Sequence, residues 1–553
     1  MSVSRMARSL SPFPRRPPSP EGKGAPARSL PSQARRAPLS LLLTATTIAL
    51  LLLLPLLYLL VRTLGIGEEA LALLLRPRTL RILWNSLALT LAVTGVALLL
   101  ALPLAWLTVR TDLPGRRVWS LLATLPLVIP SYVGGFALVA TAGPKGMLQE
   151  LLAPLGVERL PAIYGFPGAL WILSLLTYPY LFLSIRSGLH SMDPALEEAA
   201  RSLGHSPWQT FWRVTLPNLR PSMTAGALLV ALYTLSDFGA VSLLRFNSFT
   251  RAIYVQYLSS FDRSLAAVLS LTLVALTMLL LVGERRIRGR ARYYRSSAGT
   301  ARHRRPVALG RWRWPALLFT LGLVSAALLA PAGVIVYWLV RGLLAGEQLL
   351  PVWEAARNSV IAAGLAAVIV TGMALPVAYL NVRFPGRLSN LVSQSVYIGY
   401  GLPGIVVALS LVFFGANFAP FLYQTLAMLL FAYAVRFLPQ AMGAIRATLL
   451  HLNPRLEEAG QSLGLGPRAV FLRITLPLLR PGILSGLALV FLTTIKELPA
   501  TLLLSPTGFT TLATQIWSAT DEAFFARAAA PALLLLLVSA LSILLIMSQE
   551  PGD

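Results

Sequence analysis

Two stretches of the sequence, "EEAARSLGHSPWQTFWRVTLPNLRP" at 197–221 and "EEAGQSLGLGPRAVFLRITLPLLRP" at 457–481, share two glutamates, one glycine and three prolines at a separation of 260 residues. Both are polar in a chain that is otherwise strongly apolar. An amphipathic helix resting on lipid explains one such segment. It does not explain two copies with matched spacing, so we expect two equivalent docking segments on one side of a membrane.

Local signals predict the same helix–turn–helix in each copy. A capping residue before a proline starts the first helix, and the glutamates lie in its first turn, where the helix dipole favours anions. A glycine ends it. We expect the second helix to stop before a later proline, because the residue before proline resists the α conformation. The paired positions are Asp193 and Asn453 for the cap, Gly204 and Gly464 for the turn, Pro207 and Pro467 for the second start, Pro217 and Pro477 for its end, and Phe211, Val214, Leu216, Phe471, Ile474 and Leu476 for the apolar face.

The composition indicates an integral membrane protein. The 553 residues are 56% hydrophobic, with a mean hydropathy of +0.70. Apolar runs long enough to cross a bilayer recur along the chain. The absence of cysteine excludes disulfides, thiolate metal sites and cysteine nucleophiles. The sequence therefore predicts an all-α membrane protein.

Twelve membrane spans are expected, each long enough for a hydrocarbon core of about 30 Å with some tilt. The predicted spans are 39–61, 84–109, 118–141, 164–185, 222–243, 265–283, 315–340, 358–381, 389–414, 421–445, 482–503 and 527–547.

The net charge of +26 follows from the distribution of arginine. With the N-terminus inside, the predicted inner segments hold 33 of the 47 lysines and arginines, so the positive-inside rule places both termini in the cytoplasm. Residues 1–38 are predicted to form a disordered basic cytoplasmic tail. The basic linker at 284–314 fits an anionic inner leaflet better than nucleic acid, which is not expected as a partner.

The predicted spans form two repeats, 39–283 and 315–553. Asn85-Ser86 recurs as Asn358-Ser359, and "ALPLAWLTVRTDLPGR" at 101–116 recurs as "ALPVAYLNVRFPGR" at 374–387. Each repeat has six spans, so both cross the membrane in the same direction and are parallel repeats about an axis along the membrane normal. A solute path is expected on that axis, between the halves.

The repeated polar segment resembles the EAA signature, E-A-A-x3-G-x9-I-x-L-P, of permease subunits of bacterial ABC importers. The second copy departs from it where the family expects alanine, at Gly460, which would loosen that helix. The matching positions are Glu198, Ala199, Ala200, Gly204, Val214, Leu216 and Pro217 in the first copy, and Glu458, Ala459, Gly460, Gly464, Ile474, Leu476 and Pro477 in the second.

The resemblance implies a type I ABC importer fold, a bacterial cytoplasmic membrane location, and coupling helices that fit grooves on two copies of a cytoplasmic ABC ATPase. The chain has three lysines, and none lies in a P-loop, which requires G-x4-G-K-[ST]. We therefore expect the ATP and Mg²⁺ to bind the partner subunits, this chain to bind no cofactor, and ATP hydrolysis to lie outside it.

Two acidic residues fall inside predicted spans, Asp237 and Glu497, and they are 260 apart. One interpretation places these carboxylates on the solute path. The other is structural: Lys496 pairs with one of them, or they cap broken helices. Tyrosines in spans could add oxygen ligands for a hard cation, although most fit membrane-interface positions. These are Tyr132, Tyr178, Tyr233, Tyr397, Tyr400 and Tyr433.

The stretches at 236–254 and 496–517 look like fused permeases of ferric-iron importers, which work with a periplasmic or lipid-anchored binding protein. This resemblance implies Fe³⁺ as the transported substrate. Fused thiamine permeases share the duplicated layout and remain an alternative, as does another small solute or an ion-coupled secondary transporter. All four histidines fall on the predicted cytoplasmic side, so no histidine metal site is expected in the path.

Overall fold

A computed structural model describes residues 37–259, 264–288, 306–347 and 351–548. Residues 1–36 of the predicted tail at 1–38 lie outside the described residues. Residues 289–305, the central part of the predicted linker, also lie outside them. Within the described ranges every regular element is a helix, and a single isolated bridge pairs Thr111 with Val307. The all-α prediction is confirmed.

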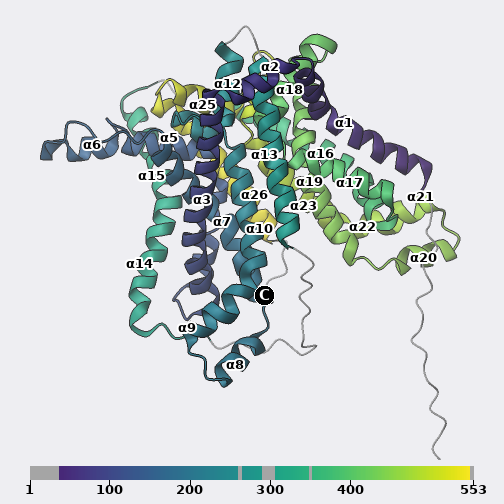
Figure 1. The fold of residues 1–553 in the computed structure, drawn as a ribbon, viewed down its shortest axis with the longest axis horizontal. Helices are drawn as coiled ribbons and strands as arrows, with labels where there is room; N and C mark the ends of the chain where they lie inside the picture. Colours follow the sequence, from purple (N-terminus) through teal and green to yellow (C-terminus); the bar gives the residue numbers. More distant parts are fainter. Residues whose placement is uncertain (1–36, 260–263, 289–305, 348–350, 549–553) are drawn as a thin grey trace, which may run out of the picture.

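Long helices dominate both halves (Figure 1). The main helices of the first half are α1 (Leu39–Leu64), α3 (Pro77–Arg110), α5 (Ser131–Ala142), α7 (Phe166–Ser191), α10 (Leu216–Ser236) and α13 (Ser264–Arg288). Those of the second half are α14 (Arg313–Val324), α15 (Ala330–Leu344), α16 (Val352–Arg383), α17 (Arg387–Tyr400), α18 (Gly404–Phe418), α19 (Leu426–His451), α23 (Arg480–Ile495) and α26 (Phe525–Ser548).

The described residues contain eight helices that are long and apolar enough to cross a membrane, and eleven if each of three bent pairs counts as one span. The sequence predicts twelve. The difference falls at 222–243, where α10 ends at Ser236 and the short helix α11 (Gly239–Leu243) follows a break at Asp237. The predicted architecture of about twelve spans in two repeats is therefore essentially correct.

Two predicted spans are sharply bent. The chain turns by 95° between α4 (Arg116–Leu122), with its 3₁₀ extension, and α5, and by 100° between α17 and α18. In each case a proline, Pro130 or Pro403, stands directly before the second helix. A proline disfavours the α conformation in the residue before it and lacks an amide hydrogen, which separates the two helical segments.

A three-helix core forms each half: α3, α7 and α10 in the first, and α16, α19 and α23 in the second. Small side chains such as Ala97, Ala101 and Ala366 are fully buried at these contacts. Gly226 on α10 lies so close to α7 that an added Cβ would be 2.9 Å from the Cα of Leu181. Small residues let helices approach closely, which favours association inside a membrane.

The first helix of each half packs on the other half. Helix α1 lies against α16, α17 and α18, and the Ser410 hydroxyl donates to the Pro55 carbonyl over 2.6 Å. Helix α15 contacts α5. The two repeats are thus interlocked through their first helices.

Candidate functional site

In the first polar segment the helix begins at Pro194 with Asp193 as its cap, as predicted. In the second it begins at Arg455, one residue later than predicted, and the Asn453 side chain accepts the Arg455 amide over 3.1 Å. The first contains α8 (Pro194–Ser202) and α9 (Pro207–Thr210), and the second contains α20 (Arg455–Ser462) and α21 (Pro467–Val470). Gly204 and Gly464 follow the first helix of each pair with φ values of 87° and 86°, a left-handed conformation that glycine adopts without strain. Figure 1 places α8 and α9 at the end of the molecule opposite α5, α12 (Phe249–Ser259) and α25 (Leu512–Asp521).

The predicted end of the second helix, before Pro217 or Pro477, is wrong. A π-helical turn at Phe211–Thr215 or Phe471–Thr475 carries the chain past the proline. In this wide turn the amide of the following leucine donates to the phenylalanine carbonyl five residues earlier. The shifted bonding accommodates a proline that has no amide hydrogen. In the first copy helix α10 then continues to Ser236; in the second a 66° bend separates α21–α22 from α23.

An ion pair ties each polar segment to the end of a long helix. Arg110, the last residue of α3, contacts Glu197 over 3.0 Å, and Arg383, the last residue of α16, contacts Glu457 over 3.0 Å. Each glutamate oxygen also accepts a threonine hydroxyl, from Thr215 at 2.9 Å or Thr475 at 3.1 Å. These side chains are mostly buried, where paired charges are held more firmly than at a surface.

These arginines were not predicted from the sequence as site residues. A signal was present, because both end the matching stretches "ALPLAWLTVR" and "ALPVAYLNVR". An aromatic contact reinforces each tether. Phe211 lies 5.0 Å from Trp106 and Phe471 lies 5.2 Å from Tyr379, between ring centroids, both edge to face.

The EAA-like residues divide between the interior and the surface. Ala200 and Gly460 are buried, while Glu198, Ala199, Glu458 and Ala459 are exposed. The residues after the π turns, namely Leu216, Pro217, Leu476 and Pro477, are half-buried.

Both segments expose apolar side chains at equivalent positions. Leu203 and Leu463, which precede the turn glycines, are 82% and 84% exposed. The other matched pairs are Leu196 with Leu456 and Trp212 with Leu472. Two equivalent apolar surfaces of this kind are typical of an interface for a partner.

Helix α20 continues through Gly460, and the expected loosening of that helix stays a prediction. The Cα of Gly460 is packed closely, since an added Cβ would lie 2.5 Å from the Cδ1 of Ile474. The first copy has alanine at 200 and the smaller valine at 214. At this contact the first copy pairs the larger Ala200 with the smaller Val214, and the second copy pairs the smaller Gly460 with the larger Ile474.

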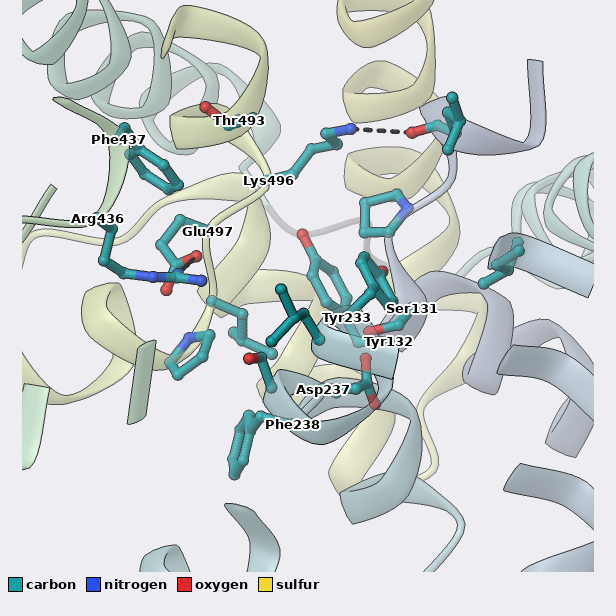
Figure 2. A pocket seen from close by; sticks show the side chains of 18 of the residues that line it. Ser131, Tyr132, Tyr233, Asp237, Phe238, Arg436, Phe437, Thr493, Lys496 and Glu497 are labelled. Atoms are coloured by element: carbon teal, nitrogen blue, oxygen red, sulfur yellow. Dashed lines mark hydrogen bonds and ion pairs between the residues drawn. The ribbon is translucent and has the colours of Figure 1, made fainter. Parts of the chain in front are cut away.

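A cavity of about 250 Å³ lies between the halves, at the breaks that follow α10 and α23 (Figure 2). The first half contributes Ser131, Tyr132, Tyr180, Tyr233 and Asp237, and the second contributes Arg436, Gln440, Thr493, Lys496 and Glu497. The sequence analysis named Asp237, Glu497 and two of these tyrosines. It missed Tyr180, Arg436, Gln440 and Thr493, because nothing in one sequence places separate spans around a common space.

Asp237 and Glu497 occupy equivalent positions at the start of a short helix. The Oδ1 of Asp237 accepts the Val241 amide over 3.2 Å in α11, and the Oε1 of Glu497 accepts the Ala500 amide over 3.2 Å at the start of α24 (Pro499–Leu504). Both therefore cap broken helices, and both line the cavity. The structural interpretation, that both carboxylates cap broken helices, is confirmed, whereas their place on a solute path stays a prediction.

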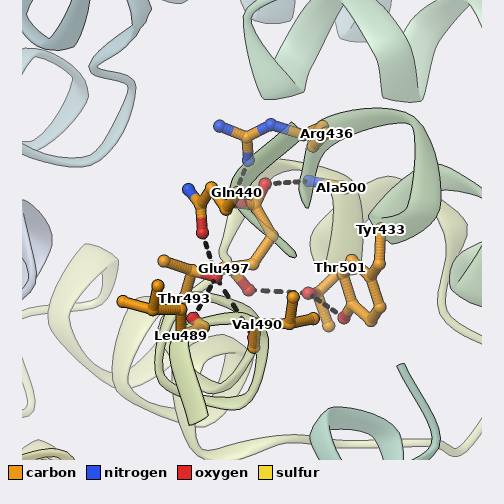
Figure 3. A network of polar contacts seen from close by, with 9 residues as sticks. All are labelled: Tyr433, Arg436, Gln440, Leu489, Val490, Thr493, Glu497, Ala500 and Thr501. Atoms are coloured by element: carbon orange, nitrogen blue, oxygen red, sulfur yellow. Dashed lines mark hydrogen bonds and ion pairs between the residues drawn. The ribbon is translucent and has the colours of Figure 1, made fainter. Parts of the chain in front are cut away.

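The surroundings of the two carboxylates differ. Glu497 forms an ion pair with Arg436, and the adjoining polar network runs through Thr501 to the hydroxyl of Tyr433 (Figure 3). Gly404 leaves room for this pair, since an added Cβ would lie 2.6 Å from the guanidinium and 2.7 Å from the carboxylate. No ion pair to Asp237 occurs in the described part of the chain, and Ser131 lies beside it (Figure 2).

Lys496 pairs with neither carboxylate, contrary to one alternative from the sequence. Its Nζ donates to the carbonyl of Leu127 over 3.0 Å, across the boundary between the halves. Tyr132 and Tyr233 line the cavity, whereas Tyr178, Tyr397 and Tyr433 do not. Within the described ranges no three His, Asp or Glu side chains are grouped closely enough to hold a metal ion.

Comparison with known proteins identifies relatives across the whole chain. The chain is 35% identical over 519 residues to the Fe(3+)-transport system permease protein FbpB 2 of Haemophilus influenzae, covering 93% of this chain and 98% of that protein. It is 26% identical to the ferric transport system permease protein FbpB of Actinobacillus pleuropneumoniae, over 68% of this chain and 57% of that one. It is 30% identical to the sulfate transport system permease protein CysT of Escherichia coli, over 30% of this chain and 61% of that protein.

One family matches both repeats, at residues 96–293 and 369–551, with the description "Binding-protein-dependent transport system inner membrane component". The two matches include the repeated polar segments, the paired carboxylates and most of the cavity wall. This duplicated multi-pass membrane protein belongs to the family of binding-protein-dependent transport system inner membrane components.

Proposed function

We propose that this chain is the permease subunit of an ATP-driven importer that carries ferric iron across the bacterial cytoplasmic membrane. The main support for this proposal is the 35% identity to a Fe(3+)-transport system permease, which extends over 93% of the chain rather than over one repeat. Matches to sulfate permeases cover less than a third of the chain.

Two copies of a cytoplasmic ABC ATPase dock on the polar segments in this proposal. Its support is the matched pair of exposed leucines, Leu203 and Leu463, on two otherwise equivalent helix–turn–helix units. ATP and Mg²⁺ bind those partner subunits. The tail, the linker and both termini then lie in the cytoplasm, as the arginine distribution predicts, and the extracytoplasmic binding protein delivers the ion to the opposite end.

Force from the ATPase reaches the cavity by two routes. The first is covalent, because the π turn joins α9 to α10, and α10 ends beside Asp237. The second passes through the Arg110–Glu197 and Arg383–Glu457 pairs into α3 and α16, which pack on α7 and α19. Movement of the halves breaks the Lys496–Leu127 hydrogen bond and opens the cavity alternately to each side.

The cavity supplies oxygen donors suited to a hard cation. Asp237 and the phenols of Tyr132 and Tyr233 come from the first half, and carboxylate and phenolate are ligands that Fe³⁺ favours. Glu497 is engaged with Arg436. Asp237 is therefore the carboxylate available to the passing ion.

Uptake of labelled Fe³⁺ by cells with and without the gene tests the proposal, with labelled thiamine and sulfate as parallel substrates. We expect loss of iron uptake alone, and Asp237→Asn should lower it at unchanged protein level. Loss of thiamine or sulfate uptake with intact iron uptake would refute the substrate. Uptake that is insensitive to vanadate but abolished by collapse of the ion gradient would instead indicate a secondary transporter.

A further inference from the structure

A second cavity, of about 230 Å³, lies between the halves near α12 and α25, at the end opposite α8 and α9 (Figure 1). Its walls come from the first half, at α11 and α12, and from the second half, at α25 and the start of α26. It shares no lining residue with the central cavity. Its chief polar side chains are Tyr164, Ser242, Arg245, Arg251, Tyr254, Thr520 and Asp521.

Two arginines dominate one wall of this cavity. Neither Arg245 nor Arg251 forms an ion pair in the described part of the chain, and the guanidinium of Arg245 lies over the ring of Tyr164, 5.7 Å from its centroid. Burial, and then the charge of Arg245, lowers the pKa of Arg251 from its ordinary value. Two cations that destabilise each other in a partly buried wall lack a neutralising partner.

The backbone is held in a costly conformation on both walls of this cavity. Among the described residues three non-glycine residues have positive φ, and two of them, Arg245 at 53° and Ala523 at 63°, line this cavity. Each follows a helix end at the position where glycine is usual. An arginine kept there is a local cost that tends to accompany a functional role.

A buried hydroxyl is also unsatisfied here. The Oγ of Ser242 is shielded from solvent and has no hydrogen-bond partner in the structure. Buried polar atoms are nearly always bonded. Ser242 thus adds an unsatisfied hydroxyl to the lining that contains the two guanidinium groups, and oxygen acceptors in the cavity would satisfy those guanidinium groups.

We propose that this cavity binds a small oxyanion of the phosphate or carboxylate class. Guanidinium groups recognise such oxygens through paired, charge-assisted hydrogen bonds. The volume is below the range usual for larger organic ligands, which fits a small anion. Because both halves form the walls, a bound anion stabilises the arrangement of the halves seen here.

Asp521, the last residue of α25, lies on the wall formed by the second half, so the two walls carry opposite charges. Asp521 lines the cavity but forms no ion pair with Arg245 or Arg251 in the described part of the chain, so its carboxylate does not neutralise them. The anion therefore lies on the arginine side, and Asp521 opposes it. Removal of the Asp521 charge should tighten binding.

Equilibrium binding of labelled inorganic phosphate and labelled citrate to the purified full chain in lipid nanodiscs tests the site without ATPase or transport. Failure of iron uptake would thus not bear on it. We expect saturable binding of at least one anion, and the preferred one distinguishes an inorganic from a carboxylate ligand. Arg251→Gln should weaken it roughly 10- to 100-fold, and Asp521→Asn should strengthen it.

Two further variants separate a binding role from a structural one. Arg245→Gly should weaken binding while leaving the melting temperature equal or higher, because glycine adopts the positive φ without strain. Arg357→Gln, at an exposed arginine of α16, is the matched control and should change nothing. Absence of saturable binding of both anions, or binding unaffected by both Arg245→Gly and Arg251→Gln, would overturn the proposal.

Discussion

The two halves are nearly identical at one end and differ in the middle. At the polar segments an arginine, a glutamate, a threonine and an aromatic pair recur with distances that agree within a few tenths of an ångström. At the central cavity Glu497 has Arg436 beside it, whereas the first half has Leu176 at the position equivalent to Arg436. Symmetry is kept at the two polar segments, and it is lost at the central cavity, which both halves line.

This asymmetry depends on complementary exchanges. Gly404, which admits the Arg436–Glu497 pair, corresponds to Ser131 in the first half, beside Asp237. The second half thus has both the Arg436 cation and, at Gly404, the space that admits it. The cavity therefore has one carboxylate that is neutralised and one that is not.

Breaking the ion pair in the second half should have the largest effect. Arg436→Met leaves the carboxylate of Glu497 buried without its cation, and we expect about 3 kcal/mol of destabilisation. Thermal unfolding of the purified protein in detergent measures the loss. Leu176→Met, the equivalent position of the first half, is the control and should have little effect. A double variant, Arg436→Met with Glu497→Gln, should recover part of the stability; an unchanged melting temperature for the single variant would contradict the role of the pair.

Loss of the Arg110–Glu197 ion pair and loss of the Arg383–Glu457 ion pair should have equal effects. Arg110→Gln and Arg383→Gln each remove a charged hydrogen bond to a glutamate, worth about 1.5–3 kcal/mol. We expect each to reduce ATPase binding to the permease by roughly tenfold or more, measured by titration of the purified ATPase. Thr215→Val, which removes one neutral hydroxyl from the same glutamate, should have a smaller effect. A large loss for one arginine variant and none for the other would break the symmetry.

The turn glycines should rank next. Gly204→Val and Gly464→Val force a branched side chain into positive φ, at a cost of about 1–2 kcal/mol per residue. Membrane insertion should be preserved and ATPase binding weakened, as shown by membrane fractionation and pull-down. Gly466→Val is the matched control, because Gly466 has φ −66°. Normal pull-down and transport in both Gly204→Val and Gly464→Val would remove the support for docking.

The smallest effect concerns the exchanged packing pair. Gly460→Ala should be more favourable in an Ile474→Val background than in the unchanged protein, by about 0.5–1 kcal/mol, because the valine leaves room for the new methyl group. Melting temperatures of the two single variants and the double variant give this coupling. Additive shifts would mean that the side chain of Ile474 moves aside freely.

Much of the fold could be predicted from residue order. The apolar runs, the arginine distribution and the recurrence of Asn85-Ser86 as Asn358-Ser359 gave two parallel repeats. The helix–turn–helix units followed from capping residues and glycines. Pro130 and Pro403 indicate interrupted spans, but the size of the bends there, 95° and 100°, could not be predicted, because an apolar run looks the same whether the chain crosses straight or turns. The continuation past Pro217 was missed because a π turn leaves no compositional signal.

The sequence by itself determined that this chain spans a membrane, that it is duplicated, and that it carries two equivalent polar segments, since these depend on composition and local spacing. The tertiary structure alone decided that Arg436 pairs with Glu497 and that Lys496 donates to the Leu127 carbonyl. It also decided that α1 contacts the second half and α15 contacts the first. Such contacts join residues tens to hundreds of positions apart. Their partners are selected by the packing of many helices at once, which no local pattern encodes.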